Sequence, residues 1–134
     1  MEDWKIKISV LWLFYTMAFL TVMSLGSLEP GVLENFILTG EIGGTKITPE
    51  LLFIFAILIL VPLIMAFLSL TLKDAANRWA NIIVGIVYTA FQVMALAETV
   101  ALPTPYAYAI LLELTKVVVP ALIVWYAWKS KQKT

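Results

Sequence analysis

The stretch YAYAILLELTKVVVPALIVWYAW, residues 106–128, decides how many helices of this chain can cross a membrane. It is apolar throughout except for Glu113 and Lys116. A membrane-spanning helix needs about 20 mostly apolar residues. A helix that began only after these charges, at Val117, would therefore be too short to span. We interpret 106–128 as one spanning helix that carries an acid and a base inside it.

Three further apolar runs, 8–28, 51–72 and 79–97, contain no charged residue. They are continuous rather than alternating, which excludes a transmembrane β-barrel. The sequence therefore predicts a single-domain, all-α membrane protein, a bundle of four transmembrane helices that run up, down, up and down. The expected segments are spans at about 5–27, 49–72, 76–101 and 105–128, an outer loop at 28–48 and a tail at 129–134.

The composition excludes several functional classes. Of the 134 residues, 62% are hydrophobic and 13% are charged, whereas a soluble domain is nearer half apolar and a quarter charged. The net charge is zero, so the basic surface that binds nucleic acid is missing. The chain has no Cys and no His, which removes disulfides, thiol chemistry and the commonest metal ligand. We therefore expect no cofactor, no metal and no catalytic residue, and an enzyme is the less favoured class.

Basic residues are distributed unevenly between the two sides of the predicted bundle. In a four-span layout only Lys46 falls on one side, and seven of the nine basic residues fall on the other. These seven are Lys5, Lys7, Lys73, Arg78, Lys129, Lys131 and Lys133. Cytoplasmic loops of membrane proteins carry the excess of Lys and Arg. We therefore expect the protein to lie in the inner membrane of the cell, with both termini in the cytoplasm.

The outer loop has its own structural signals. Pro30 and Gly40 bracket a short segment in which Val32, Leu33, Phe36 and Ile37 share one helical face. This pattern predicts a short amphipathic helix on the outer rim of the bundle. The alternative is a β-hairpin that pairs 35–38 with 45–48. After the loop, Thr48-Pro49-Glu50 is typical of a helix start.

The two charges inside the fourth span are the strongest functional candidates. Glu113 and Lys116 are three residues apart and so lie on one helical face. A charge in hydrocarbon costs about 2.5–3.5 kcal/mol, so such residues normally face the bundle interior. They form either a self-neutralising ion pair or a ligand counter-ion or proton relay. Pro120 has no N–H to give the Lys116 carbonyl, which favours the functional interpretation.

Polar residues of other spans fall at the same depth. Tyr88 and Gln92 recur at helical spacing on the third span, and Tyr15 lies at a similar level on the first. The predicted ligand-binding residues are Glu113, Lys116, Gln92, Tyr88 and Tyr15.

Other residues have structural interpretations. We expect Thr16 and Asn81 to form interhelical hydrogen bonds, and Gly85 to allow close helix approach. Pro62 should kink the second span. The short link before Asn77 predicts a tight hairpin of the second and third spans, with the segment from Asn77 capping the third. Glu98 lies near the outer end of its span, where a carboxylate reaches water.

Three motifs carry a resemblance that extends over nearly the whole chain. They are the hairpin segment Asn77-Arg78-Trp79-Ala80-Asn81-Ile82-Ile83, the loop Glu29-Pro30-Gly31 and the helix entry Ile47-Thr48-Pro49-Glu50. Together they resemble an uncharacterised family of small prokaryotic four-helix membrane proteins, a domain of unknown function. The resemblance implies the four-span fold and a prokaryotic inner membrane, and it implies no activity. The DoxX-like and sterol-isomerase-like bundles are similar in shape, but the histidines of the isomerase-like group have no counterpart here.

Two functional classes therefore stay open. The first is binding or transport of a small amphiphilic or lipidic molecule at the intramembrane polar site. The second is a structural or accessory protein that acts through helix–helix association, and a lipid-modifying enzyme is a weaker third. The expected partners are membrane lipids and the amphiphile, with no nucleic acid, and pairing into a homodimer or higher homo-oligomer is left open.

Overall fold

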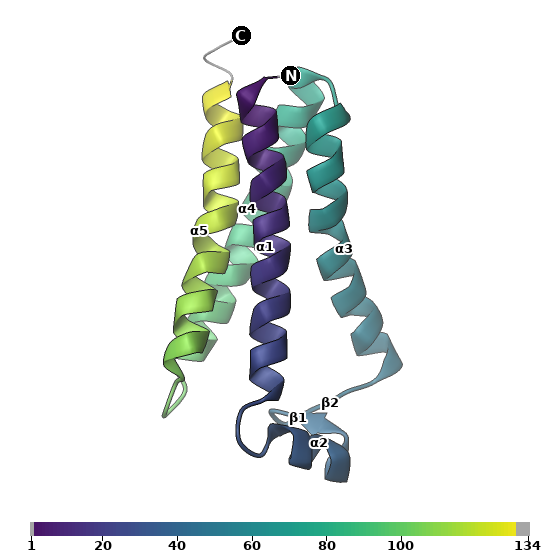
Figure 1. Ribbon diagram of the computed structural model, residues 1–134, viewed down its shortest axis with the longest axis vertical. Coiled ribbons are helices and arrows are strands. Elements are labelled where there is room, and N and C mark those ends of the chain that lie inside the picture. Colours follow the sequence, from purple (N-terminus) through teal and green to yellow (C-terminus); the bar gives the residue numbers. More distant parts are fainter. Residues whose placement is uncertain (1, 131–134) are drawn as a thin grey trace.

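The computed structural model describes residues 2–130, which form four long helices and a small element between the first two (Figure 1). The long helices are α1 (Asp3–Ser27), α3 (Pro49–Thr71), α4 (Asp74–Val100) and α5 (Ala107–Ser130). All four are long and apolar enough to cross a membrane. The predicted all-α fold with four spanning helices is confirmed.

The two ends of the bundle differ. The start of α1, the turn between α3 and α4 and the end of α5 lie together at what we call the terminal end (Figure 1). The opposite end, the loop end, carries the small element and the α4–α5 connection. Lys5 Nζ lies 2.6 Å from Asp74 Oδ1 and ties the start of α1 to the start of α4. Of the basic residues expected on one side, Lys131 and Lys133 lie outside the described residues.

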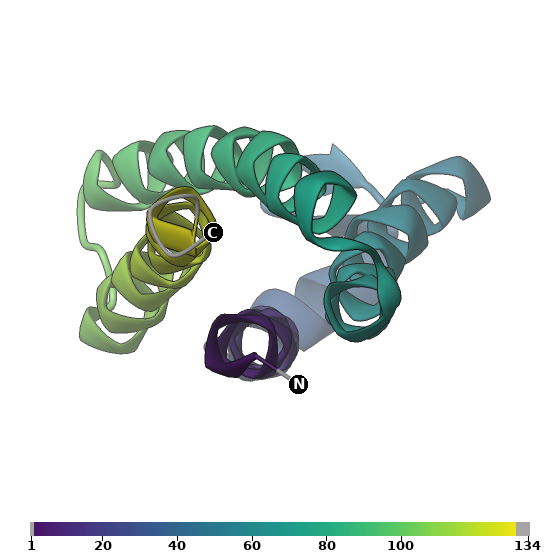
Figure 2. The ribbon, with the colours of Figure 1, turned by 90° about the horizontal axis from the view of Figure 1, so that it is seen from above.

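The helices pack in an order that differs from their order in the chain. α1 packs between α3 and α5, and α4 packs against α5. Figure 2 shows α4 arching from its turn with α3 across to α5. The expected tight hairpin of α3 and α4 is therefore wrong beyond the turn. The backbones of α3 and α4 lie close only near their shared turn, a few side-chain hydrogen bonds join them further along, and α3 packs mainly on α1.

The starts of α3 and α4 show one prediction that holds and one that fails. Thr48 Oγ1 accepts a 3.2 Å hydrogen bond from the Leu51 N–H, so Thr48 caps α3 as its sequence predicts. Helix α4 begins earlier than expected, with Lys73 at the capping position. Asn77 is therefore not a cap. It is fully buried one turn inside α4 and donates a 2.7 Å hydrogen bond to the Ser69 carbonyl of α3.

The loop between α1 and α3 contains the predicted amphipathic helix, α2 (Val32–Thr39), and also a small hairpin. Strands β1 (Glu41–Ile42) and β2 (Thr45–Lys46) pair antiparallel. Both turn residues, Gly43 and Gly44, have positive φ, as a tight two-residue hairpin requires. The alternative in which 35–38 forms a strand is wrong, because these residues belong to α2.

A buried polar network joins α1, α3 and α4 near the terminal end. The Trp12 indole N–H and the Ser69 hydroxyl both donate to Asn81 Oδ1, at 2.7 and 3.2 Å. The Asn81 amide donates in turn to Asn77 Oδ1 at 2.7 Å. The interhelical role predicted for Asn81 is confirmed. The same prediction for Thr16 is wrong, since its hydroxyl donates to the Trp12 carbonyl of its own helix at 3.0 Å.

Gly85 brings α4 close to α5. A Cβ at this position would lie 2.6 Å from Val124 Cγ2 and 3.4 Å from the Pro120 carbonyl oxygen. The first distance is shorter than real non-bonded carbon–carbon contacts, so a larger residue would force Val124 or the helices to shift. The predicted close helix approach at Gly85 is confirmed. This contact holds the part of α5 that follows the charged pair against α4.

Candidate functional site

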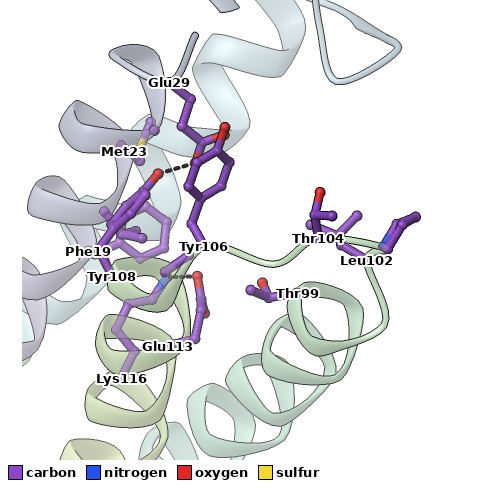
Figure 3. Close-up of a pocket in the computed structure, with 14 residues that line it drawn as sticks. Phe19, Met23, Glu29, Thr99, Leu102, Thr104, Tyr106, Tyr108, Glu113 and Lys116 are labelled. Carbon is purple, nitrogen blue, oxygen red and sulfur yellow. Dashed lines mark hydrogen bonds and ion pairs between the residues drawn. The ribbon is translucent and has the colours of Figure 1, made fainter.

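A cavity of about 530 Å³ runs from the α4–α5 connection to the charged pair of α5. Helix α1 supplies its apolar wall through Phe19, Val22 and Met23. Leu102 and Thr104 of the connection lie across from them, and Glu113 and Lys116 lie at the deep end (Figure 3). The cavity therefore combines an apolar wall with a charged floor.

The charged floor is an ion pair within one helix. Lys116 Nζ lies 3.1 Å from Glu113 Oε1, and the i, i+3 spacing on α5 holds the two groups on the same face. Glu113 is only 7% exposed and Lys116 only 4%. The Lys116 ammonium also lies 4.7 Å from the centre of the Phe19 ring, where the negative face of the ring attracts a cation. Two contacts thus neutralise the Lys116 charge inside the bundle.

The second carboxylate oxygen of Glu113 is in a different situation. Glu113 Oε2 is buried and has no hydrogen-bond partner within the described residues. A buried polar atom without a partner costs about 1–3 kcal/mol, and more when it is charged. Glu113 itself lines the cavity, so this unpartnered carboxylate lies next to the space that a bound molecule would occupy.

The mouth of the cavity carries a second carboxylate. Glu29, just after α1, accepts a hydrogen bond from the Tyr108 hydroxyl of α5 (Figure 3). The Tyr106 ring lies beside Tyr108, with 5.9 Å between the ring centres. A Cβ on Gly26 would lie 3.7 Å from the Tyr108 hydroxyl oxygen, an ordinary contact, so the small residue leaves this side of the mouth open.

The other predicted site residues lie away from the lining of this cavity. The Gln92 amide donates a 2.5 Å hydrogen bond to the Tyr15 hydroxyl, and both side chains are fully buried. Tyr88 packs edge-on against Tyr15 and Trp12, and its hydroxyl donates to the Leu58 carbonyl at 3.0 Å. The structure thus places Glu113 and Lys116 in the lining of the cavity. The other three, Tyr15, Tyr88 and Gln92, lie in a buried cluster. Ligand binding by any of the five stays a prediction.

Sequence reasoning did not assign Glu29 or Tyr108 to the site. The two are 79 residues apart, and no local pattern marks them as neighbours. Glu98 is exposed on α4 and does not line the cavity, and its contact with water stays a prediction. Within residues 2–130, no group of three or more carboxylates lies close enough together to hold a metal ion.

A second cavity of about 470 Å³ lies beneath α2 and the hairpin, between α1 and α3. Its lining is mainly apolar and includes Val32, Ile47 and Phe55. Gly26 and Glu29 belong to both linings, so the two cavities adjoin at the loop end of α1.

Four helices that are long and apolar enough to span a membrane make this chain a multi-pass helical membrane protein, and α1, α4 and α5 line the cavity with the charged floor. It belongs to the family of unknown function DUF6326, which matches residues 1–134. The resemblance to an uncharacterised domain family is therefore confirmed. No curated protein and no solved structure matches the chain.

Proposed function

We propose that this protein binds a small amphiphilic or lipidic molecule, with the polar group of that molecule at Glu113 and Lys116. One observation carries the proposal: a cavity of about 530 Å³ ends at a buried ion pair in which Glu113 Oε2 lacks a partner. The volume falls in the range of about 300–1,000 Å³ typical of small-molecule sites.

The chemistry of the walls supports an amphiphile over a fully polar solute. Phe19, Val22 and Met23 give a hydrocarbon chain an apolar surface to cover. Glu113 and Lys116 give a polar group its hydrogen bonds at the end of that surface. A structural ion pair would be stable in a filled bundle and would not require a cavity beside it, so the cavity favours binding over a purely structural role.

The entrance of the cavity follows from the proposed orientation. Apart from Lys46 and Lys116, the described basic residues lie at or near the helix ends that meet at the terminal end, which we infer to be cytoplasmic. The mouth at Glu29 and the α4–α5 connection then faces the opposite side of the cell membrane. In this orientation the amphiphile enters from the outer leaflet or from the space outside it.

Three ten-carbon probes test binding: decylamine, 1-decanol and decanoate. The full chain is purified in detergent, stripped of bound lipid and titrated with each probe under native mass spectrometry. We expect saturable binding of at least one probe, one molecule to each chain.

Gly26→Leu is the variant that blocks the cavity. Its backbone is ordinary helix, and the added side chain would occupy the space beside Tyr108 without removing a charge. Binding should disappear in Gly26→Leu. If no probe binds the native chain, or if Gly26→Leu binds equally well, the proposed function is wrong.

A further inference from the structure

We propose that the cavity selects an amphiphile whose polar group is a primary ammonium, a lipophilic amine. This inference rests on the proposed function and names its ligand class. Three charged side chains line the cavity, and they are Glu29, Glu113 and Lys116. The lining therefore has two carboxylates and one ammonium group, and its net charge is negative.

The single positive charge is already engaged. Lys116 Nζ lies 3.1 Å from Glu113 Oε1 and 4.7 Å from the centre of the Phe19 ring. An anionic head would have to compete with Glu113 for this ammonium group while it approached two carboxylates. In a site of low dielectric such like-charge contacts are costly. The cavity is therefore poorly suited to fatty acids or phosphate-headed lipids.

Glu113 Oε2 sets the hydrogen-bonding requirement. An ionised carboxylate is only an acceptor, so the missing partner must be a donor. A primary ammonium supplies three N–H donors together with a positive charge, and charge-assisted hydrogen bonds are about twice as strong as neutral ones. A hydroxyl supplies a donor without the charge, and a quaternary ammonium supplies the charge without a donor. Of these three head groups, only the primary ammonium satisfies both requirements at this oxygen, and it does so with the most donors.

The mouth of the cavity also favours a cationic ligand. Glu29 is held at the entrance by the hydrogen bond from Tyr108, and the rings of Tyr106 and Tyr108 lie beside it (Figure 3). A carboxylate with aromatic rings around it attracts cations both by charge and through the ring faces. An approaching alkylammonium would therefore meet favourable groups at the mouth and at the floor.

Affinities of the three ten-carbon probes decide the ligand class. An alkylamine is protonated at pH 7, as a lysine side chain is. Decylamine should bind the native chain about tenfold or more tightly than 1-decanol. A tenfold gain in affinity is about what one charge-assisted hydrogen bond contributes. Decanoate should bind most weakly. The chain length is the same in all three probes, so differences report the head group alone.

Two carboxyl-to-amide variants and a matched control locate the selectivity. Glu29→Gln should weaken decylamine binding by about threefold and Glu113→Gln by about tenfold, with 1-decanol binding nearly unchanged. Glu98→Gln changes an exposed carboxylate that lines no part of this cavity, and it should leave all three affinities unchanged. If Glu113→Gln fails to fold, Glu29→Gln still tests the amine preference, because Glu29 is only partly buried and lines the mouth of this cavity.

The outcomes separate the two proposals. Equal affinities for decylamine and 1-decanol, or tighter binding of decanoate, would overturn the amine preference and leave amphiphile binding intact. A decylamine preference that is as large in the folded carboxyl-to-amide variants as in the native chain would also overturn the assignment to this cavity. Failure of all three probes would instead overturn the proposed function itself.

Discussion

The hydroxyl of Tyr88 on α4 donates a 3.0 Å hydrogen bond to the carbonyl oxygen of Leu58 on α3. Leu58 lies four residues before Pro62, which has no N–H to complete the helical hydrogen bond to that carbonyl. The tyrosine therefore supplies the donor that the proline withholds. A proline inside a spanning helix is tolerated where a neighbouring helix satisfies the released acceptor. Tyr88 is thus a structural partner of α3, although its sequence position suggested a ligand-binding role.

Tyr88→Phe should destabilise the bundle because it leaves the Leu58 carbonyl without a donor. The expected loss is about 1 kcal/mol in the free energy of unfolding, within the range of interhelical hydrogen bonds in membranes. Unfolding in mixed detergent micelles, followed by circular dichroism, measures it.

Pro62→Ala supplies the matched background for this prediction. It restores an N–H four residues after Leu58, so Tyr88→Phe should cost much less in that background. Equal losses in both backgrounds would mean that the tyrosine hydroxyl does not act through the Leu58 carbonyl.

The charged pair makes a second prediction, about stability rather than binding. Glu113→Gln strands a buried ammonium, and Lys116→Met strands a buried carboxylate. Each single change should cost on the order of 3 kcal/mol in unfolding free energy. The double change removes both desolvated charges together and should cost much less than the sum of the two. The same unfolding assay, applied to the three variants, gives the coupling between the residues.

Additive losses would show that the two groups act independently, in conflict with the 3.1 Å contact. The amphiphile site predicts a further result for the double variant: it should fold and yet lose the preference for decylamine over 1-decanol. A double variant that is as stable as the parent and binds the probes equally well would leave only a structural ion pair.

Local sequence patterns predict the elements of this fold well. The four apolar runs, the Thr48 cap and the amphipathic segment at Val32 depend on residues close together in the chain, where helix period and capping chemistry apply directly. The i, i+3 contact of Glu113 and Lys116 is local in the same way. Each of these features follows from one helix alone.

The sequence marks Asn81 and Gly85 as interhelical contacts, but it does not show which helices pack together. The packing of α3 on α1, the burial of Asn77 and the hydrogen bond of Tyr88 all depend on interhelical geometry. The mouth of the cavity joins Glu29 to Tyr108 across 79 residues. Because side-chain spacing within one helix does not fix helix rotation or neighbours, these contacts appear only in the folded bundle.

Gly85 provides a third prediction, at the closest approach of α4 and α5. Gly85→Ala places a methyl group 2.6 Å from Val124 Cγ2, and the stiff β-branched side chain cannot turn aside freely. Alanine favours a helix over glycine, yet overpacking should outweigh this gain and cost about 1–3 kcal/mol in unfolding free energy. Val124→Ala in the same chain should restore most of the loss by removing the clashing methyl group. A Gly85→Ala variant more stable than the parent would contradict the close approach.

The orientation of the bundle provides the last prediction. Because the chain contains no cysteine, a single introduced cysteine reports one position without background. Glu34 is exposed on α2 at the loop end, and Ala75 is exposed in the first turn of α4 at the terminal end. We propose that the excess of Lys and Arg holds the terminal end in the cytoplasm, so Glu34→Cys should react with a membrane-impermeant maleimide in intact cells. Ala75→Cys should react only after the cells are permeabilised. Neither change removes a basic residue, so the charge distribution that sets the orientation is preserved. Labelling of Ala75→Cys but not Glu34→Cys in intact cells would reverse the orientation and open the cavity mouth toward the cytoplasm.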